Sequence, residues 1–194
     1  YEEGRVRAGS RNRELDTVNP GNRDNAGFAA WVHSDHGISA KVRELSYQYQ
    51  NYVFYGEWLV PHTVKHYRKD VWNKFYIFDV YDTTTSKFLP YDEYQPILET
   101  YGVDYIPCIK KIKNASYDNF MYEAKNCKYL LEDPDNQVGE GIVIKNYDWI
   151  PKNHTGHVTW AKVVLEQFKD DFYKVMGANL LENKTNAQTI CELA

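Results

Sequence analysis

The six residues from Glu140 to Lys145 (EGIVIK) constrain the fold of this chain most. Three consecutive β-branched residues favour a strand, and a carboxylate and a glycine in front of them are typical of a strand that begins at a polar site. Because side chains alternate between the faces of a strand, we expect Glu140 to share one face with the two isoleucines, and Gly141 to share the other with Val143 and Lys145. Gly141 would let another group approach the backbone closely.

Further segments complete the expected architecture, which is an α+β fold. Besides 139–147, strand-like patterns occupy residues 5–8, 52–59, 74–81 and 157–165. The first of these would form a hairpin whose turn lies at residues 2–4. Helical patterns occupy residues 28–32, 40–49, 92–101 and 117–131, with a break at Gly37 between the first two, a start near Ser116 for the last and a stop at Gly102 for the third.

Length and composition indicate an ordinary soluble protein. The chain has 194 residues, which predicts one domain, or one domain with a short appendage. We expect the domain to cover residues 1–169 and a helical tail to follow at 170–194. No apolar run approaches the roughly 20 residues that a membrane-spanning helix needs. The three widely spaced cysteines form no metal-binding pair, and we expect a reduced, cytoplasmic protein. The 17 tyrosines and 5 tryptophans suit a fold rich in strands.

The net charge of the chain argues against a protein whose overall positive charge attracts nucleic acid. The formal net charge is −4. Basic residues are nevertheless concentrated in three short segments, any of which could contact phosphate: residues 5–13, 65–69 and 110–113. A phosphate-binding loop of the G-x-x-x-x-G-K-(S/T) type is absent, and so is a G-x-S-x-G nucleophile elbow. The His33-Ser34-Asp35-His36 segment lacks the spacing of a zinc site.

Several short motifs together resemble those of the covalent nucleotidyltransferases. They are Arg11 in SRNREL, the Gly56-Glu57 pair, the Phe78-Asp79 pair, Glu140 in EGIVIK, and Lys162 in WAKVV. Each motif alone is common, but their order and spacing over residues 11–162 are similar to the ATP-dependent RNA ligases of the phage nick-sealing type. The resemblance implies an antiparallel-sheet, ATP-grasp-like adenylyltransferase domain of the kind found in RNA and DNA ligases.

The resemblance also implies roles for these residues. Phe78 would stack on adenine, Glu57 would contact the ribose, and Arg11 would lie near the nucleotide or the RNA 5′-phosphate. In the same scheme Lys162 would contact the α-phosphate and Glu140 would support Mg²⁺. Asp79 is a catalytic candidate whose expected face, opposite Phe78, argues against a direct role unless the strand twists. Lys145 is a candidate phosphate contact. The implied cofactors are ATP (or bound AMP) and Mg²⁺, and the implied partners are RNA ends or nicked duplex RNA.

One departure from the family pattern concerns the nucleophile. The family forms lysyl-AMP on a lysine in a K-x-(D/H/N)-G motif ahead of the Arg11 segment, and no lysine precedes Arg11 here. Lys174-Val175-Met176-Gly177 has the spacing but follows the last motif, so we expect a glycine-capped helix end there. A second departure is Val164, where the family often has another lysine. We therefore expect this chain not to adenylate itself.

Three functions remain open at this point. The first is the adenylation domain of an RNA ligase whose N-terminal strand, with the nucleophile, is expected to lie outside the given sequence. Such a ligase joins RNA 3′-hydroxyl and 5′-phosphate ends through lysyl-AMP and an RNA-adenylate. The second is a non-catalytic module that binds nucleotides or nucleic-acid ends. The third is an aromatic-rich β domain that binds carbohydrate or protein. Only the first two predict a response to ATP.

Overall fold

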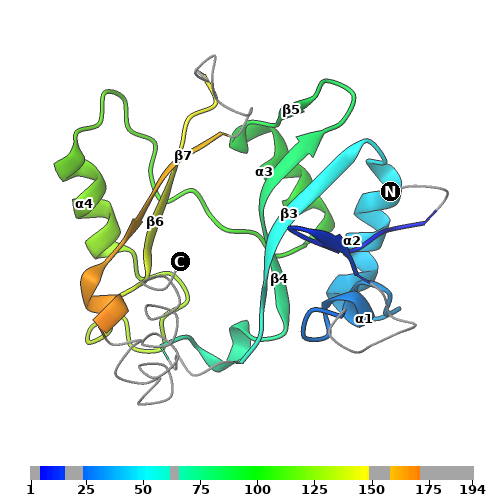
Figure 1. The fold of residues 1–194 in the computed structure, drawn as a ribbon, viewed down its shortest axis with the longest axis horizontal. Helices are drawn as coiled ribbons and strands as arrows, with labels where there is room; N and C mark the ends of the chain where they lie inside the picture. The colour runs from blue at the N-terminus through cyan, green and yellow to red at the C-terminus, as the bar shows by residue number, and fades with distance from the viewer. Residues whose placement is uncertain (1–4, 16–23, 62–65, 149–157, 171–194) are drawn as a thin grey trace, which may run out of the picture. The chain divides into compact units, whose positions relative to one another are not determined.

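The computed structural model describes residues 5–15, 24–61, 66–148 and 158–170. Its elements form an α+β arrangement with small antiparallel sheets (Figure 1). The chain divides into two compact units. The first comprises Tyr1–Val60, Asn73–Cys108 and Tyr147–Val158, and the second comprises Pro61–Trp72, Ile109–Asn146 and Thr159–Ala194. None of the helices within the described ranges is long and apolar enough to cross a membrane.

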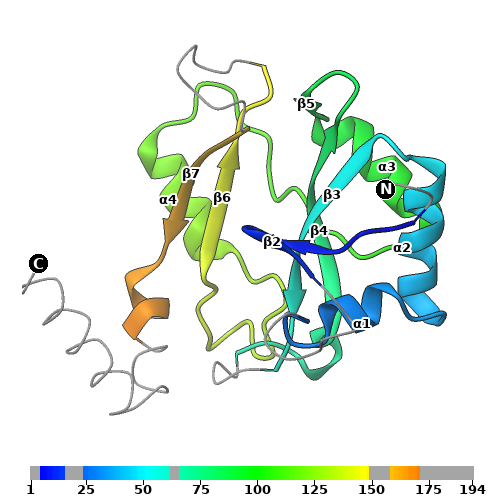
Figure 2. The same cartoon turned by 45° about the vertical axis from the view of Figure 1, so that its right-hand side comes forward.

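The first unit is built around a three-stranded antiparallel sheet in the order β3-β4-β5. Its elements in chain order are β1 (Gly9–Ser10), β2 (Arg13–Glu14), α1 (Phe28–Val32), α2 (Gly37–Gln48), β3 (Tyr52–Leu59), β4 (Lys74–Asp82), β5 (Lys87–Phe88) and α3 (Tyr91–Tyr101). Figure 2 shows the three helices of this unit together on one side of β3 and β4. The structure confirms the expected strands at 52–59 and 74–81 and the expected helices at 28–32 and 92–101. Helix α3 begins one residue earlier than expected, and β4 ends one residue later.

The core of the first unit lies between the sheet and its helices. Leu45 of α2, Ile77 of β4 and Leu98 of α3 are fully buried in it. An aromatic group continues this core, because the Phe28 ring lies 4.8 Å from Phe75 and 5.6 Å from Trp58. Aromatic side chains are the largest apolar groups available, so these tight contacts stabilise the α1–sheet junction strongly.

In the second unit, helix α4 packs on a strand pair. The elements of this unit are the 3₁₀ turn Lys69–Val71, α4 (Tyr117–Asn126), β6 (Gly141–Lys145) and β7 (Thr159–Val164). Strands β6 and β7 are antiparallel, and the buried Ala124 of α4 packs in one cluster with Leu165 and Phe168, which Ile142 and Val163 of the strands border. Both strands are shorter than the 139–147 and 157–165 expected.

Three expected boundaries are wrong. The expected strand at residues 5–8 does not form; the nearest strand is β1 at Gly9–Ser10, which turns at residues 11–12 into β2, and the expected turn at residues 2–4 lies outside the described residues. Helix α2 begins at Gly37, which therefore belongs to the helix. Helix α4 begins after Ser116, whose side chain forms the expected N-cap, but it ends at Asn126 because Cys127 is extended. The expected tail at 170–194 lies almost wholly outside the described residues.

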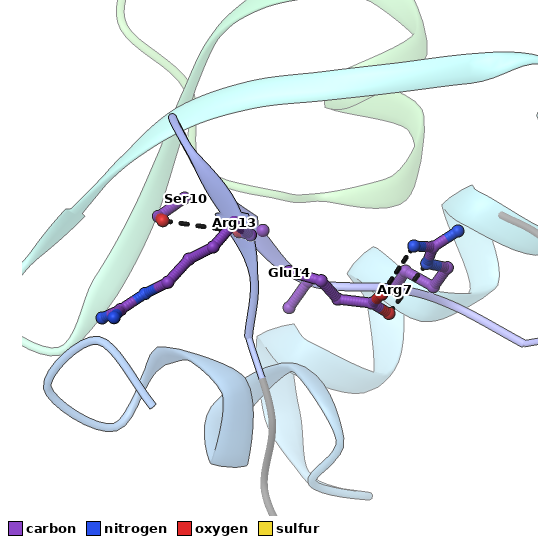
Figure 3. A pocket seen from close by; sticks show the side chains of 6 residues that line it. Arg7, Ser10, Arg13 and Glu14 are labelled. Carbon is purple, nitrogen blue, oxygen red and sulfur yellow. Dashed lines mark hydrogen bonds and ion pairs between the residues drawn. The ribbon is translucent and has the colours of Figure 1, made fainter. Parts of the chain in front are cut away.

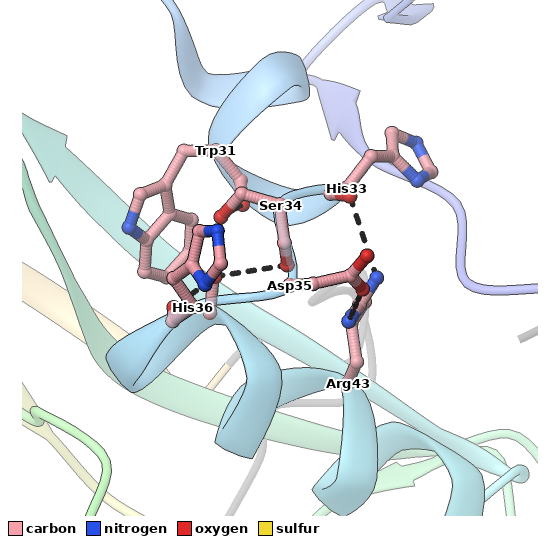
Figure 4. Close-up of polar contacts among 7 residues, drawn as sticks. Trp31, His33, Ser34, Asp35, His36 and Arg43 are labelled. Atoms are coloured by element: carbon pink, nitrogen blue, oxygen red, sulfur yellow. Dashed lines mark hydrogen bonds and ion pairs between the residues drawn. The ribbon is translucent and has the colours of Figure 1, made fainter.

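Polar contacts of Arg43 hold the turn between α1 and α2 (Figure 4). Arg43 forms an ion pair with Asp35 and donates to the His33 carbonyl at 3.3 Å. The hydrogen bond from Arg43 lowers the pKa of the Asp35 carboxyl. Across the described residues no group of three or more His, Cys, Asp or Glu side chains could hold a metal ion.

Candidate functional site

A β-bulge lies at Phe78, in the middle of the expected nucleotide-binding motif. Tyr55 of β3 pairs with Asp79, whereas the next residue, Gly56, pairs with Ile77. Phe78 is thus the extra residue of β4. A bulge places two residues of one strand against one residue of its partner and often re-aims a side chain next to a functional site. The core residues of β4 agree with this insertion. Phe75 and Ile77 are two residues apart, as in a regular strand, whereas the next core residue, Val80, comes three residues later.

This bulge corrects the expected placement of Asp79. Strict alternation would put Asp79 on the face opposite Phe78, but alternation does not run through an inserted residue. Neither side chain belongs to the apolar core, whose β4 members are Phe75, Ile77 and Val80. The two motif residues therefore both lie across from Tyr55 without any need for the strand to twist.

Glu57 lies on the same face of the sheet as Phe78. It pairs directly with Tyr76 of β4, and Phe78 is two residues further along that strand. Residues directly opposite in an antiparallel pair share a face, and diagonal neighbours are still within side-chain reach. Glu57 is exposed and Phe78 is half-buried. Tyr55, 44% exposed, lies on this face as well and was not anticipated from the sequence.

The backbone of the bulge is held by a buried tyrosine. Tyr94 of α3 is 1% exposed, and its hydroxyl donates to the Phe78 carbonyl at 3.0 Å. Burial, with a smaller effect of Tyr147 and Asp79, raises the pKa of the Tyr94 hydroxyl, so the group stays protonated and remains a donor. Since the extra residue of a bulge interrupts the strand ladder, this side-chain hydrogen bond satisfies an acceptor inside the fold.

Asp79 itself is 6% exposed and lies near two tyrosine hydroxyls. Burial and then the nearby Asp79 carboxylate raise the pKa of Tyr147. Within the described residues the buried Tyr147 hydroxyl has no hydrogen-bond partner of ordinary geometry, although it lies close to Tyr94. This polar group beside a buried carboxylate is the kind of pairing that marks a functional environment.

Removing the hydroxyl of Tyr94 tests this support. We expect Tyr94→Phe to lower the free energy of unfolding by about 1–3 kcal/mol, because the Phe78 carbonyl would lose this hydrogen bond inside the fold. Urea unfolding measures the change. Tyr91→Phe is the matched control, since the ring of Tyr91 lies 5.3 Å from that of Tyr94 and its hydroxyl makes no hydrogen bond among the described residues. Equal losses in the two variants would contradict the role given to Tyr94.

Arg11 occupies the tip of the N-terminal hairpin. It is exposed and makes no hydrogen bond or ion pair with any described residue, so the structure does not join it to Glu57 or Phe78. Beside it is an open hollow of about 270 Å³, lined by Arg7, Ala8, Gly9, Ser10, Arg13 and Glu14 (Figure 3). None of the expected nucleotide-binding residues lines this hollow.

Two contacts fix the hollow's polar edge. Arg7 donates to both carboxylate oxygens of Glu14, at 2.8 and 2.5 Å, and this hydrogen-bonded pair raises the pKa of Arg7. A bidentate arginine–carboxylate pair is geometrically specific. Arg7 is therefore already neutralised by Glu14, which leaves Arg11 at the turn better placed to contact a phosphate.

In the second unit, Lys162 and Lys145 share the strand face that points away from α4. Lys162 pairs with Val143, whereas Ile142 and Val163 border the buried cluster under α4. By alternation along β6, Lys145 lies on the side of Val143, as expected. A second bulge occurs here, because Ile144 pairs with Ala161 but Lys145 pairs with Thr159, so Trp160 is the extra residue.

The side chain of Lys162 is exposed, and it makes no hydrogen bond or ion pair with the described residues. Val143 and Val164 on the same face are 49% and 37% exposed. The two valines provide a partly apolar surface beside the aliphatic part of Lys162. Its charged end is exposed to solvent and can bind an anion.

Glu140 is positioned by the two glycines that flank it. A Cβ on Gly139 would lie 2.4 Å from the Cys127 carbonyl, and one on Gly141 would lie 1.8 Å from the Val163 carbonyl. The close approach expected at Gly141 is therefore confirmed, and the approaching group is β7. The Glu140 carbonyl accepts from the Leu165 N–H at 2.9 Å, while its side chain is exposed. The sequence predicted that Glu140 shares a strand face with Ile142. Because β6 begins at Gly141, strand alternation does not fix the direction of the Glu140 side chain.

Glu140 alone could contribute to a magnesium site. Mg²⁺ is commonly held by one or two carboxylates together with water and substrate phosphates, so it does not require the cluster of three ligands that the described residues lack. An exposed carboxylate on a fixed backbone fits that mode.

Apart from Arg11, the expected residues therefore form two groups. Glu57, Phe78 and Asp79 gather at the bulge of β4 in the first unit, whereas Glu140, Lys145 and Lys162 belong to the β6–β7 pair of the second. Sequence reasoning missed Tyr55 and Tyr94. Alternation from Glu57 could have placed Tyr55, but nothing in the local sequence of α3 indicates that Tyr94 reaches the Phe78 carbonyl.

Comparison with known families identifies the family of the chain. The RNA ligase family matches residues 1–164, and the chain belongs to that family. Family membership indicates a ligase that acts on RNA. No curated protein and no solved structure matches the chain.

Proposed function

We propose that this chain is the nucleotidyltransferase domain of an ATP-dependent RNA ligase of the nick-sealing type. In the proposed reaction, AMP passes from ATP to a lysine as pyrophosphate leaves, and then to an RNA 5′-phosphate as the lysine leaves. A 3′-hydroxyl finally displaces AMP. The observation that carries the proposal is the bulge at Phe78, which brings Glu57, Phe78 and Asp79 to one place in a chain of the RNA ligase family.

The first unit supplies nucleotide recognition in this proposal. The half-buried ring of Phe78 offers a face on which adenine stacks, and the exposed Glu57 carboxylate accepts hydrogen bonds from ribose hydroxyls. Tyr94 holds the Phe78 backbone, so the ring is presented by a rigid element. Arg11 reaches phosphate from the tip of the hairpin.

The second unit supplies charge. Negative charge develops on the α-phosphate oxygens during transfer, and a preorganised cation lowers the barrier by meeting it. Lys162 takes that role, and Lys145 on the same face adds a further phosphate contact. Glu140 would hold Mg²⁺ with its exposed carboxylate. Mg²⁺, when bound, supplies Lewis-acid stabilisation of the phosphate oxygens.

The last step of the reaction provides a direct test. In that step the 3′-oxygen forms a bond to the RNA 5′-phosphorus, the pyrophosphate bond to AMP breaks, and the hydroxyl proton goes to solvent. This step requires no lysine nucleophile. The chain, supplied with Mg²⁺ and a pre-adenylated RNA strand beside a 3′-hydroxyl, should release AMP and produce the joined strand on a denaturing gel. No joining by a demonstrably folded sample would refute the proposed catalytic function, and AMP binding without joining would favour a non-catalytic module.

Nucleotide affinity should depend on the ring of Phe78. We expect Phe78→Ala to weaken AMP binding by about 1–3 kcal/mol, the usual contribution of stacking between a base and an aromatic side chain. Isothermal calorimetry measures it. Phe78→Tyr keeps the ring and should bind within a few-fold of the original chain.

Phe120→Ala is the matched control for Phe78→Ala. Phe120 is a half-buried phenylalanine on α4 with no proposed nucleotide contact, so its loss should leave AMP affinity unchanged. If the two alanine variants bind AMP equally well, Phe78 is not the stacking residue.

A further inference from the structure

The sheet face of the proposed nucleotide contacts continues as a group of aromatic side chains. Tyr55 of β3, Tyr81 of β4 and Phe88 of β5 form this group, which we call the aromatic shelf. The Phe88 ring lies 5.8 Å from that of Tyr55 and 5.1 Å from that of Tyr81. Tyr81 pairs directly with Phe88 on one side and with Val53 on the other, and Val53 shares the face of Tyr55 by alternation. The three rings therefore lie on one face.

The aromatic shelf lies beyond Phe78 on the side opposite Glu57. Tyr55 and Glu57 are two residues apart on β3, which separates them by about 6–7 Å. Tyr55 pairs with Asp79, one residue after Phe78 on β4, whereas the partner of Glu57 is Tyr76, two residues before it. Phe78 thus lies between the levels of Tyr55 and Glu57. A base stacked on Phe78 with its ribose at Glu57 would point its far edge towards Tyr55.

The ring of Tyr55 leans across the neighbouring strand. Adjacent strands of a sheet lie about 4.8 Å apart, so β3 and β5 are separated by about 10 Å with β4 between them. A distance of 5.8 Å between the Tyr55 and Phe88 rings therefore requires both side chains to lean over β4. Tyr55 is nevertheless 44% exposed, so part of it remains available to a ligand.

The connection between β4 and β5 fixes the position of Phe88. On one side of it, the Asp82 carboxylate accepts from the Thr84 N–H at 2.8 Å within the turn. On the other side, the Leu89 N–H donates to the Val80 carbonyl at 2.8 Å, and both side chains are buried in the core. Phe88 therefore supports Tyr55 from a fixed backbone, which preorganises the aromatic shelf before a ligand binds.

We propose that Tyr55 selects purine over pyrimidine nucleotides by contacting the edge of the base that is farthest from the sugar. A purine reaches farther from its sugar than a pyrimidine, because its five-membered ring lies between the sugar and the six-membered ring. Only a purine stacked on Phe78 would meet the aromatic shelf while its ribose stays at Glu57. This inference deepens the proposed function, on which it rests for the identity of the site.

Paired measurements with AMP and CMP test the role of Tyr55. Both bases carry an exocyclic amine beside a ring nitrogen, so the two nucleotides differ mainly in the size of the base. Isothermal calorimetry on the full chain measures AMP binding, and competition against AMP measures CMP binding. We expect Tyr55→Ala to weaken AMP binding by about 2- to 12-fold, the usual contribution of an edge-to-face aromatic contact, and to leave CMP binding unchanged. Tyr55→Phe keeps the ring and should retain the original ratio of affinities.

Two control variants separate selection by Tyr55 from general damage. Phe78→Ala should weaken AMP and CMP binding alike, because either base can stack on this ring. Tyr47→Ala removes a tyrosine that is 51% exposed on α2, and should change neither affinity. Helix α2 packs against the other face of the sheet, so Tyr47 lies away from the aromatic shelf (Figure 2).

Phe88 provides a further test as a positioning residue, because it would act on the base only through Tyr55. Phe88→Ala should lower the ratio of AMP to CMP affinity, since the Tyr55 ring would lose the neighbour that holds it. Adding Phe88→Ala to Tyr55→Ala should lower the ratio no further, as expected for two residues that act through one contact. A further fall in the double variant would contradict this arrangement.

The same measurements distinguish this inference from the proposed function. Weaker AMP binding with unchanged CMP binding in Tyr55→Ala supports purine selection at the aromatic shelf. If Tyr55→Ala leaves the ratio of affinities unchanged while Phe78→Ala weakens AMP binding, the inference is wrong and the nucleotide site stands. A folded chain that binds neither nucleotide refutes both.

Discussion

Lys162→Ala should slow the joining of a pre-adenylated RNA strand by about 10²–10³-fold. Lys162 is an exposed cation, it has no hydrogen-bond or ion-pair partner among the described residues, and it lies between two partly exposed valines. Removing one preorganised interaction with the developing charge typically costs this much in rate. Single-turnover joining, followed on denaturing gels, measures it. Lys87→Ala, at an exposed lysine of β5, should join at the original rate.

The response to metal distinguishes Lys162 from Glu140. If Glu140 holds Mg²⁺, raising the Mg²⁺ concentration should partly restore Glu140→Ala, because a weaker site can be filled by mass action. It should not restore Lys162→Ala, whose missing charge lies on the protein. Near-normal joining by Lys162→Ala would show that the α-phosphate contact has been assigned to the wrong lysine. Position 164 is a valine, so no lysine two residues after Lys162 can compensate for its loss.

The central strands of the first unit were predictable because local and long-range preferences agree there. Residues 52–59 and 74–82 are rich in aromatic and β-branched side chains, and the antiparallel pairing buries one side of each strand. Helix α3 was equally clear, since it is preceded by Pro90 and followed by Gly102 in the left-handed conformation. When local residue preferences and long-range packing agree in this way, few other structures are possible for the segment.

The strand expected at residues 5–8 was misplaced along the chain. The structure forms its first strand at Gly9–Ser10 and turns at Arg11-Asn12. Two buried residues, Ala8 and Leu15, decide the outcome: the Leu15 N–H donates to the Ala8 carbonyl at 2.9 Å, and both side chains join the core. That core is formed by distant elements, so its effect on the register is invisible to local pattern.

The candidate site was predicted in its residues but not in its geometry. The motif pair Phe78-Asp79 was identified from residue type and spacing, whereas its bulge arises from pairing with Tyr55 and Gly56. Gly56 also permits close packing, because a Cβ there would lie 2.6 Å from the ring of Phe75 and from the Tyr76 carbonyl. The glycine of the Gly-Glu pair is therefore explained by cross-strand contact, which a single sequence cannot display.

Both groups of candidate residues include an interrupted strand pair. One bulge inserts Phe78 into β4, and the other inserts Trp160 into β7, two residues before Lys162. Bulges are common beside functional sites because they re-aim side chains without dissolving the sheet. Regular alternation would have predicted an uninterrupted strand at both places. The two departures from that pattern therefore coincide with the residues of the proposed chemistry.

Gly141→Ala should be the most destabilising single substitution at the candidate site. Gly141 has φ of 145°, a conformation that is nearly restricted to glycine, and the added Cβ would lie 1.8 Å from the Val163 carbonyl. Backbone strain of this kind costs about 1–3 kcal/mol, and forcing β7 away from β6 costs about 1–3 kcal/mol more. We therefore expect a loss of roughly 3 kcal/mol or more in the free energy of unfolding, measured with urea.

The proper comparison is another glycine next to a strand carbonyl. A Cβ on Gly9 would lie 3.6 Å from the Arg13 carbonyl, which is an ordinary contact, so Gly9→Ala should change stability by no more than about 0.5 kcal/mol. The same displacement of β7 should shift Lys162 relative to Glu140, because both depend on the β6–β7 register. Gly141→Ala should consequently lose joining activity even at temperatures where it remains folded. A stable, active Gly141→Ala variant would mean that β6 and β7 do not approach each other this closely in the working enzyme.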